Sequence, residues 1–190
     1  GDEWVKEAAK RGLSYLKDTP RALKVWSDKK VAKLFNDMNV LTPRELEARQ
    51  EIEFESYILK MQIEARLMGD LVQTHIIPAV VEYQNRLVQN IQGLITVLGD
   101  KAGRVAAQSQ LQLVDKISGH LNKMKSTCDT MLQARKEANK IEHAEEKALA
   151  YCDKVKVYFD EIRYNADKLE LLVDDELWPL PKFREMLFTR

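Results

Sequence analysis

The stretch ALAYCDKVKVYFDEIRYNADKLELLV, residues 148–173, decides the fold class of this chain. Its apolar side chains recur at alternating steps of four and three residues, at Ala148, Cys152, Val155, Phe159, Ile162, Ala166, Leu169 and Val173. That spacing places them in one stripe along an α-helix and favours left-handed, coiled-coil-like packing against other helices. We therefore predict a long helix from about Glu142 to Val173 and an all-α fold.

A second strong signal lies upstream, at Thr42-Pro43-Arg44-Glu45. Thr42 as the N-cap, proline at the first helical position and Glu45 three residues after the cap form a capping box. The apolar stripe that follows is Phe54, Ile58, Met61, Ala65, Met68 and Val72, continued by Leu87, Ile91, Leu94 and Leu98. We predict one helix over residues 42–98, roughly 85 Å long if straight.

Pro78 interrupts this long helix. A proline removes one backbone donor and clashes with the carbonyl four residues earlier, here that of Thr74. We therefore predict a kink near residues 74–78.

A third stripe predicts the remaining long helix, from about Arg104 to Ala138. Its members are Val114, Ile117, Leu121, Met124, Cys128 and Met131. Short connections near residues 99–103 and 139–141 make the three long helices antiparallel neighbours in an elongated bundle. A turn near residue 140 is expected to bring Cys128 and Cys152 to one level of the bundle, as reduced thiols.

The chain divides into three expected regions. Residues 1–41 read as short helices, residues 42–176 as the long-helix bundle and residues 177–190 as an apolar tail. The start of the long helix overhangs its partner, so Phe54, Tyr57, Ile58 and Met61 need cover. We expect the aromatic-rich segment 4–38 to supply it, an absent parent domain being the alternative.

The C-terminal tail begins where Pro179 and Pro181 stop the last long helix. It is crowded with apolar residues, namely Leu177, Trp178, Leu180, Phe183, Met186, Leu187 and Phe188. Such a peptide is too apolar to remain in water. We expect an ordered tail with Trp178 largely buried, docked on its own bundle near residues 95–110 or on a neighbouring subunit.

Composition excludes several classes of function. Thirty basic residues balance thirty acidic ones among 190, so no net charge attracts nucleic acid or an anionic membrane, and we expect neither partner. No apolar run is long enough to span a membrane. Two cysteines are too few for a disulfide framework, which makes the cytoplasm the simplest setting.

Motifs that carry chemistry are missing from the sequence. The seven glycines form no phosphate-binding loop, and no C-x-x-C or H-E-x-x-H occurs. None of the three histidines follows a glutamate at the spacing of a di-iron bundle. His75 beside Pro78 reads as structural, and His120 and His143 as ordinary, partly exposed residues. The residues therefore predict no catalytic, cofactor-binding or metal site.

Several segments, in collinear order, carry a resemblance to a known family. They are EAAKRGL at 7–13, LTPRELEAR at 41–49, HIIPA at 75–79, YQN at 83–85, YC at 151–152, YFDEIR at 158–163, DKLE at 167–170 and VDDELWPLPKFREMLF at 173–188. Together they resemble the C-terminal region of type III glutamine synthetases, and the resemblance extends over essentially the whole chain.

This resemblance implies a parent enzyme that joins ammonia to glutamate with ATP and divalent metal, arranged in stacked hexameric rings. Its ATP, metal and glutamate ligands would precede Gly1, so the resemblance implies no cofactor in this chain. It also implies that residues 1–41 are the tail of the catalytic region or a linker. The implied role is architectural, in contacts with neighbouring subunits or with the missing catalytic region. Two other interpretations are a free-standing helical adaptor and a small helical enzyme; the strict apolar stripes argue against the enzyme.

Overall fold

The computed structural model describes residues 1–187, apart from the side chains of Phe183 and Arg184, and within that range the regular structure is helical with no strand. The predicted all-α class is confirmed. The chain forms two compact units. The first contains Gly1–Ile63 and Arg135–Lys156, and the second contains Glu64–Ala134 and the chain from Val157 onward.

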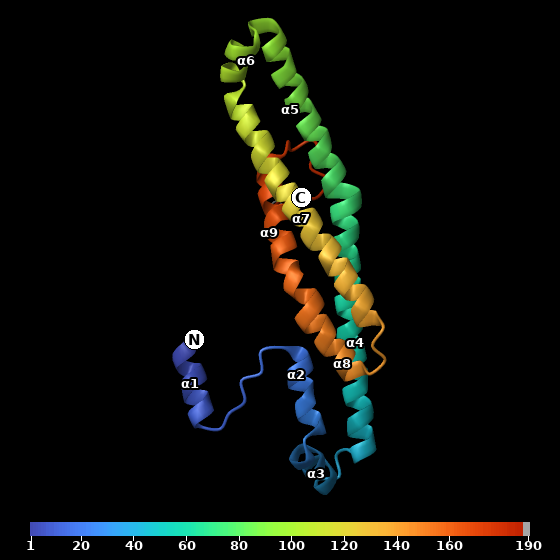
Figure 1. The fold of residues 1–190 in the computed structure, drawn as a ribbon. Helices are drawn as coiled ribbons and strands as arrows, with labels where there is room; N and C mark the ends of the chain where they lie inside the picture. The colour runs from blue at the N-terminus through green and yellow to red at the C-terminus, as the bar shows by residue number, and fades with distance from the viewer. Residues whose placement is uncertain (188–190) are drawn as a thin grey trace. The chain divides into compact units, whose positions relative to one another are not determined.

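The first unit opens with short helices (Figure 1): α1 (Asp2–Lys10), α2 (Thr19–Leu23), the 3₁₀ turn η1 (Lys24–Ser27) and α3 (Lys29–Asp37). Gly12 ends the α1 segment with a φ of 72°, a conformation that glycine adopts without strain. The Asp28 side chain caps α3 by accepting from the Lys30 N–H. The cap of α2 is Asp18, whose side chain accepts from the Arg21 N–H.

The long helix α4 (Pro43–Asp70) starts in this unit with the predicted capping box. The Thr42 N–H donates to Glu45 Oε2 over 2.8 Å, and the Glu45 N–H donates to Thr42 Oγ1 over 3.3 Å. The end of α7 (Gln108–Asn139), α8 (Ala144–Ala150) and the π-helical turn η3 (Tyr151–Val155) complete the unit. These elements enclose the core residues Leu46, Phe54, Tyr57, Ile58, Met61, Ala148, Tyr151 and Val155.

The structure confirms only part of the cover that was expected over the start of α4. Gln50 of α4 donates to the Leu23 carbonyl at the end of α2, so the α2–η1 segment does pack there. By contrast, Trp4 of α1 is 56% exposed and Tyr15 is 53% exposed. Figure 1 shows α1 standing away from α2. These two rings therefore do not supply the expected cover.

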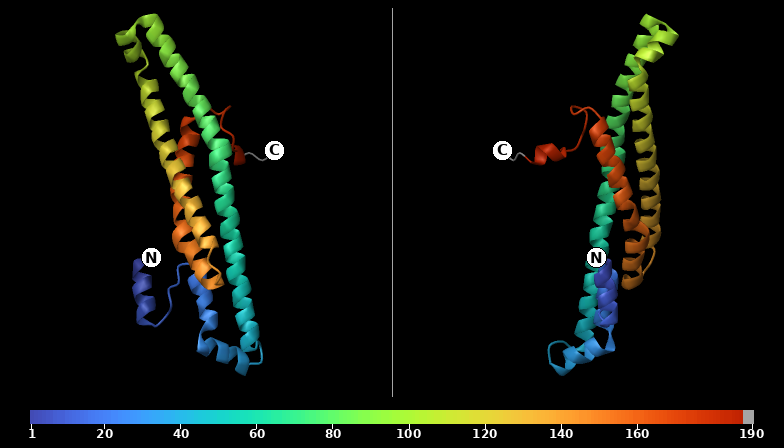
Figure 2. Two further views of the ribbon diagram at one scale, coloured as in Figure 1. Left: turned by 45° about the vertical axis from the view of Figure 1, so that its right-hand side comes forward. Right: turned by 90° about the vertical axis from the view of Figure 1, so that its left-hand side faces the viewer.

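In the second unit the backbone continues from α4 through the π-helical turn η2 (Leu71–Ile76) into α5 (Ile77–Leu98). A widened turn thus lies just before Pro78, where a kink was predicted; the kink itself stays a prediction. This turn shifts the hydrogen-bond pattern where the proline has no N–H to donate. After α5 come the short helix α6 (Asp100–Ala106) and most of α7, side by side with α5 in both views of Figure 2.

Hydrogen bonds fix the helix register in this unit. Gln84 donates to Ser118 over 2.8 Å and Asn90 donates to Gln110 over 2.8 Å. Ascending positions on α5 therefore meet descending ones on α7, which makes the pair antiparallel as predicted. The turn η4 (Lys156–Tyr158) leads into α9 (Phe159–Leu172), which runs antiparallel to α7 by the same test, because His120 meets Asn165 and Thr127 meets Glu161. The core includes Val72, Ile76, Val80, Ile91, Ile117, Met124, Met131, Ile162 and Leu169.

The tail after α9 is ordered through the short helix α10 (Phe183–Met186). Trp178 is buried, as predicted, with 8% of its surface exposed. Lys182 Nζ donates to the Glu170 carbonyl at the end of α9 over 2.9 Å and pairs with Asp175. The tail therefore docks near the end of α9 rather than near residues 95–110. Met186 and Leu187 remain 61% and 65% exposed, and Phe188 lies outside the described residues.

Candidate functional site

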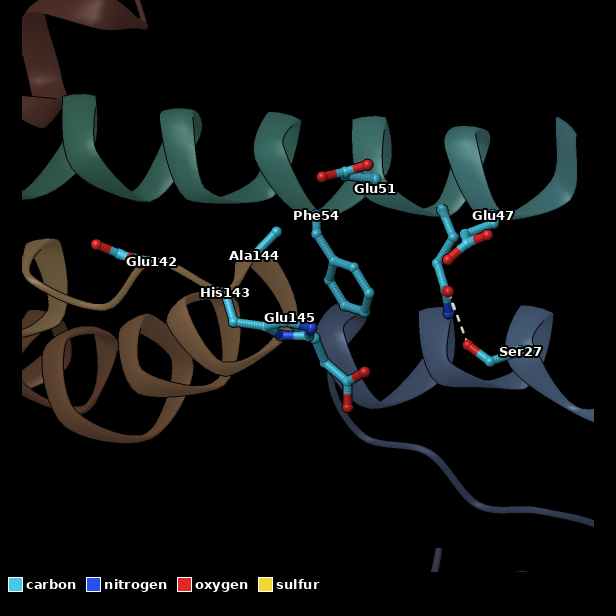
Figure 3. A pocket seen from close by; sticks show the side chains of 9 residues that line it. Ser27, Glu47, Glu51, Phe54, Glu142, His143, Ala144 and Glu145 are labelled. Carbon is cyan, nitrogen blue, oxygen red and sulfur yellow. Dashed lines mark hydrogen bonds between the residues drawn. The ribbon is translucent and has the colours of Figure 1, made fainter. Parts of the chain in front are cut away.

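The clearest hollow of the first unit lies between the start of α4, η1 and α8, with a volume of about 610 Å³ (Figure 3). The lining residues are Ser27, Glu47, Gln50, Glu51, Phe54, Glu142, His143, Ala144 and Glu145. In Figure 3 the Phe54 ring points from α4 toward the short helices. Ser27 Oγ donates to Gln50 Oε1 over 2.7 Å.

Polar side chains around this hollow join the elements that enclose it. Gln50 is 9% exposed, and its amide is satisfied from both sides by Ser27 and the Leu23 carbonyl. Glu145 pairs with Lys24 over 2.5 Å, which joins α8 to η1. Among the described residues no cluster of three or more His, Cys, Asp or Glu side chains is arranged to hold a metal. The absence of a metal or cofactor site stays a prediction.

An arginine clamp lies in the same unit. Arg21 of α2 reaches Asp153 of η3 with two nitrogens, at 3.0 and 2.9 Å, and Asp18 with one, at 2.7 Å. Hydrogen bonds to these two carboxylates raise the pKa of Arg21, and a bidentate pair of this kind fixes orientation. The clamp therefore attaches α2 to the π-helical turn.

Tyr57 is another perturbed group of this unit. Its burial, with the Cys152 thiol beside it, raises the pKa of Tyr57 well above its ordinary value.

The second unit contains a polar seam between α7 and α9. His120 Nδ1 lies 2.9 Å from Asn165 Oδ1, and Asn165 donates its amide to the Glu161 carbonyl over 2.8 Å. Thr127 Oγ1 and Lys123 Nζ both reach the Glu161 carboxylate at 3.0 Å. Asn165 and Thr127 are buried, so losing a partner here would leave a desolvated polar group. The seam sets the register of the two helices.

The Glu161 carboxyl makes this seam sensitive to acid. Hydrogen bonds from Lys123 and Thr127 lower its pKa below the ordinary value, against a weaker effect of burial. A carboxyl group whose pKa is lower in the folded protein than in the unfolded chain, where it is about 4.3, stabilises the fold at pH values above 4.3. That stability is lost as the pH falls through the pKa of the folded state.

We predict that the urea concentration at the midpoint of unfolding falls more between pH 7 and pH 3 for the wild-type protein than for Glu161→Gln. Urea unfolding followed by circular dichroism measures both. Glu64→Gln, at an exposed glutamate without such donors, is the control and should follow wild type. Parallel curves for wild type and Glu161→Gln would show that the carboxylate contributes nothing.

The histidines and cysteines singled out in the sequence lie apart from one another along the chain. His143 is exposed at the start of α8, as expected. His75 is exposed in η2, and the structural role predicted for it stays a prediction. His120 is half-buried and belongs to the seam, which sequence analysis missed; the signal was the polar Asn165 inside an otherwise apolar pattern. Cys128 is buried and Cys152 half-buried, and both are free thiols.

The level predicted for Cys128 is wrong. The bonds from His120 to Asn165 and from Thr127 to Glu161 place Cys128 opposite residues near 157–160 of the second unit. That level lies beyond Cys152 in the sequence. The predicted turn at residue 140 was centred too early, because α7 continues to Asn139 and α8 begins only at Ala144.

No helix in the described part of the chain combines the length and apolar character needed to cross a bilayer.

Comparison with known proteins gives consistent matches. A family model described as the glutamine synthetase C-terminal domain matches residues 1–94. A glutamine synthetase of Bacteroides fragilis (strain YCH46) is 39% identical over 189 residues, which is 100% of this chain and 26% of that protein. A type-3 glutamine synthetase of Dictyostelium discoideum is 31% identical over 188 residues, again 26% of its length. A glutamine synthetase of Butyrivibrio fibrisolvens is 30% identical over 188 residues. The chain thus spans about a quarter of the length of these relatives.

Proposed function

We propose, because this chain belongs to the type III glutamine synthetase family as a C-terminal region, that it is a non-catalytic helical module of a longer glutamine synthetase. In this proposal the parent protein ligates ammonia to glutamate at the expense of ATP, in the cytoplasm. The module shapes the subunit and contacts neighbouring subunits or the catalytic region that precedes it.

The single observation that supports this role most strongly is the extent of the match. The Bacteroides relative aligns along 100% of this chain, yet the chain corresponds to only 26% of that protein. The ligand-binding residues of such an enzyme would then lie in the other three quarters.

The way the polar side chains are used in the two units agrees with the proposal. Gln50, Arg21, Asn165 and Glu161 each bond to another helix or turn of their own unit. Polar groups engaged in this way stabilise helix packing. A module of this kind holds its shape and presents surfaces to other parts of an assembly.

We predict that the purified 190-residue chain forms no glutamine from glutamate, ammonia, ATP and magnesium. The longer protein that contains it should form glutamine under the same conditions. A coupled assay for ADP release, with glutamine measured by chromatography, tests both. ATP-dependent glutamine formation by the isolated chain would overturn the non-catalytic assignment, and a longer protein without ligase activity would overturn the parent assignment.

A further inference from the structure

The solvent-facing side of α4 in the first unit carries an unpartnered apolar seam. Ile52 is 61% exposed, and Leu59 and Ile63 are each 57% exposed. At 100° per residue these three lie within a narrow strip of the helix surface. Exposed aliphatic side chains aligned in this way mark a contact surface when nothing in the unit covers them.

This seam lies opposite the face that α4 buries. Phe54, Ile58 and Met61 are 3%, 7% and 8% exposed, and they project about 180° around the helix from the seam. One face of α4 therefore packs on its own unit while the other remains free to pack on something else.

The spacing of the exposed seam is that of a helix–helix interface. Ile52, Ser56, Leu59 and Ile63 follow one another at steps of four, three and four residues, and all four are exposed. This is the d-a-d-a pattern of a coiled-coil seam. The occupant that fits such a surface is another helix with the same spacing.

We propose that this seam pairs, antiparallel and about a two-fold axis, with the same seam of a second copy of the chain. The pairing places Ile52 opposite Ile63 and Ser56 opposite Leu59. Each a position then meets a d position, and the small serine lies beneath a leucine. A closed two-fold contact uses the same patch on both copies.

Charge complementarity supports this pairing. Glu53 and Lys60 are both exposed and lie one heptad apart on the same flank of the seam. Within the described part of the chain neither belongs to an ion pair. In the antiparallel arrangement, equivalent flanks of the two helices face each other, so each Lys60 approaches Glu53 of the other copy. The contact forms twice because of the two-fold axis.

A parallel arrangement fits the seam less well. It would place Ser56 opposite Ser56, with two small polar side chains in the middle of an apolar interface. It would also align the two helix dipoles, whereas an antiparallel pair sets them in opposition. The antiparallel register is therefore the one we adopt.

This inference rests on the proposed function, because it names the surface through which one module contacts another. Cysteine cross-linking of the whole 190-residue chain tests it. One sample carries Ile52→Cys and a second carries Ile63→Cys, each with its two native cysteines. The two are mixed in equal amounts and oxidised mildly, and the linked peptides are identified by mass spectrometry.

The expected result is a covalent dimer that contains one copy of each variant, with much less linkage in either variant alone or in wild type. Adding Leu59→Asp to both variants should reduce the yield at least tenfold. Adding Leu13→Asp, at a position that is 53% exposed in the same unit, should leave it unchanged. Far-UV circular dichroism checks that each variant is folded.

Self-linkage of Ile52→Cys would overturn the antiparallel register, and no linkage above the wild-type level would overturn the pairing itself. Failure here is separable from failure of the proposed function. If the longer enzyme loses its assembly when this chain is removed but the cysteine pair does not link, the proposed role of the module stands and this contact is rejected.

Discussion

Replacing Leu169 with alanine is expected to lower the free energy of unfolding by about 2–5 kcal/mol. Leu169 has 0% of its surface exposed in the core of the second unit, on the stripe of α9 that the sequence marks most clearly. The substitution removes three carbon atoms from a packed site, so both the lost burial and the remaining cavity contribute. Urea unfolding followed by circular dichroism at 222 nm measures the change.

The same substitution two residues later provides the control. Leu171 lies on α9 as well but is 78% exposed, so Leu171→Ala makes the same change in helix propensity without opening a cavity. It should stay within about 0.5 kcal/mol of wild type. If the two variants were equally stable, the stripe of α9 would not be the face that packs.

Gly103→Ala should destabilise the turn between α5 and α6 by about 1–3 kcal/mol. An added Cβ at Gly103 would lie 2.5 Å from Ile95 Cα, 2.8 Å from Ile95 N and 2.9 Å from the Leu94 carbonyl oxygen. All three are backbone atoms, so α6 can accept the methyl group only by moving away from α5. The loss exceeds the usual gain of up to about 1 kcal/mol for replacing glycine with alanine inside a helix.

Gly119→Ala is the matched substitution. Gly119 lies within α7, and an added Cβ would meet nothing within 4 Å. This variant should be more stable than wild type by about 0.5–1 kcal/mol. Thermal unfolding of the two variants should therefore shift in opposite directions from wild type. An increase in stability for Gly103→Ala would show that α6 does not press against α5.

Much of the fold follows from the pattern of apolar residues. The stripes on α4, α7 and α9 consist largely of residues that the structure buries, such as Phe54, Ile117 and Leu169. The capping box at Thr42 appears as predicted, because it depends only on residues three positions apart. Local chemistry and helical periodicity are sufficient for features of this kind.

Other features depend on contacts between segments far apart in the sequence. The two π-helical turns, Leu71–Ile76 and Tyr151–Val155, shift the helical register, and only the first has a local signal, in Pro78. The seam of His120 with Asn165 and the clamp of Arg21 on Asp153 join residues whose proximity depends on tertiary packing. The exposed apolar seam of α4, at Ile52, Leu59 and Ile63, was not predicted, because the buried stripe on the opposite face already accounted for the helix.

The mass in solution of the longer protein that contains this chain, measured by light scattering after gel filtration, tests the central claim most directly. The same protein ended just before Gly1 is the comparison. If the chain is an assembly module, the complete protein forms a large oligomer and the shortened one remains folded but assembles into smaller species. Identical masses for the two would contradict the account.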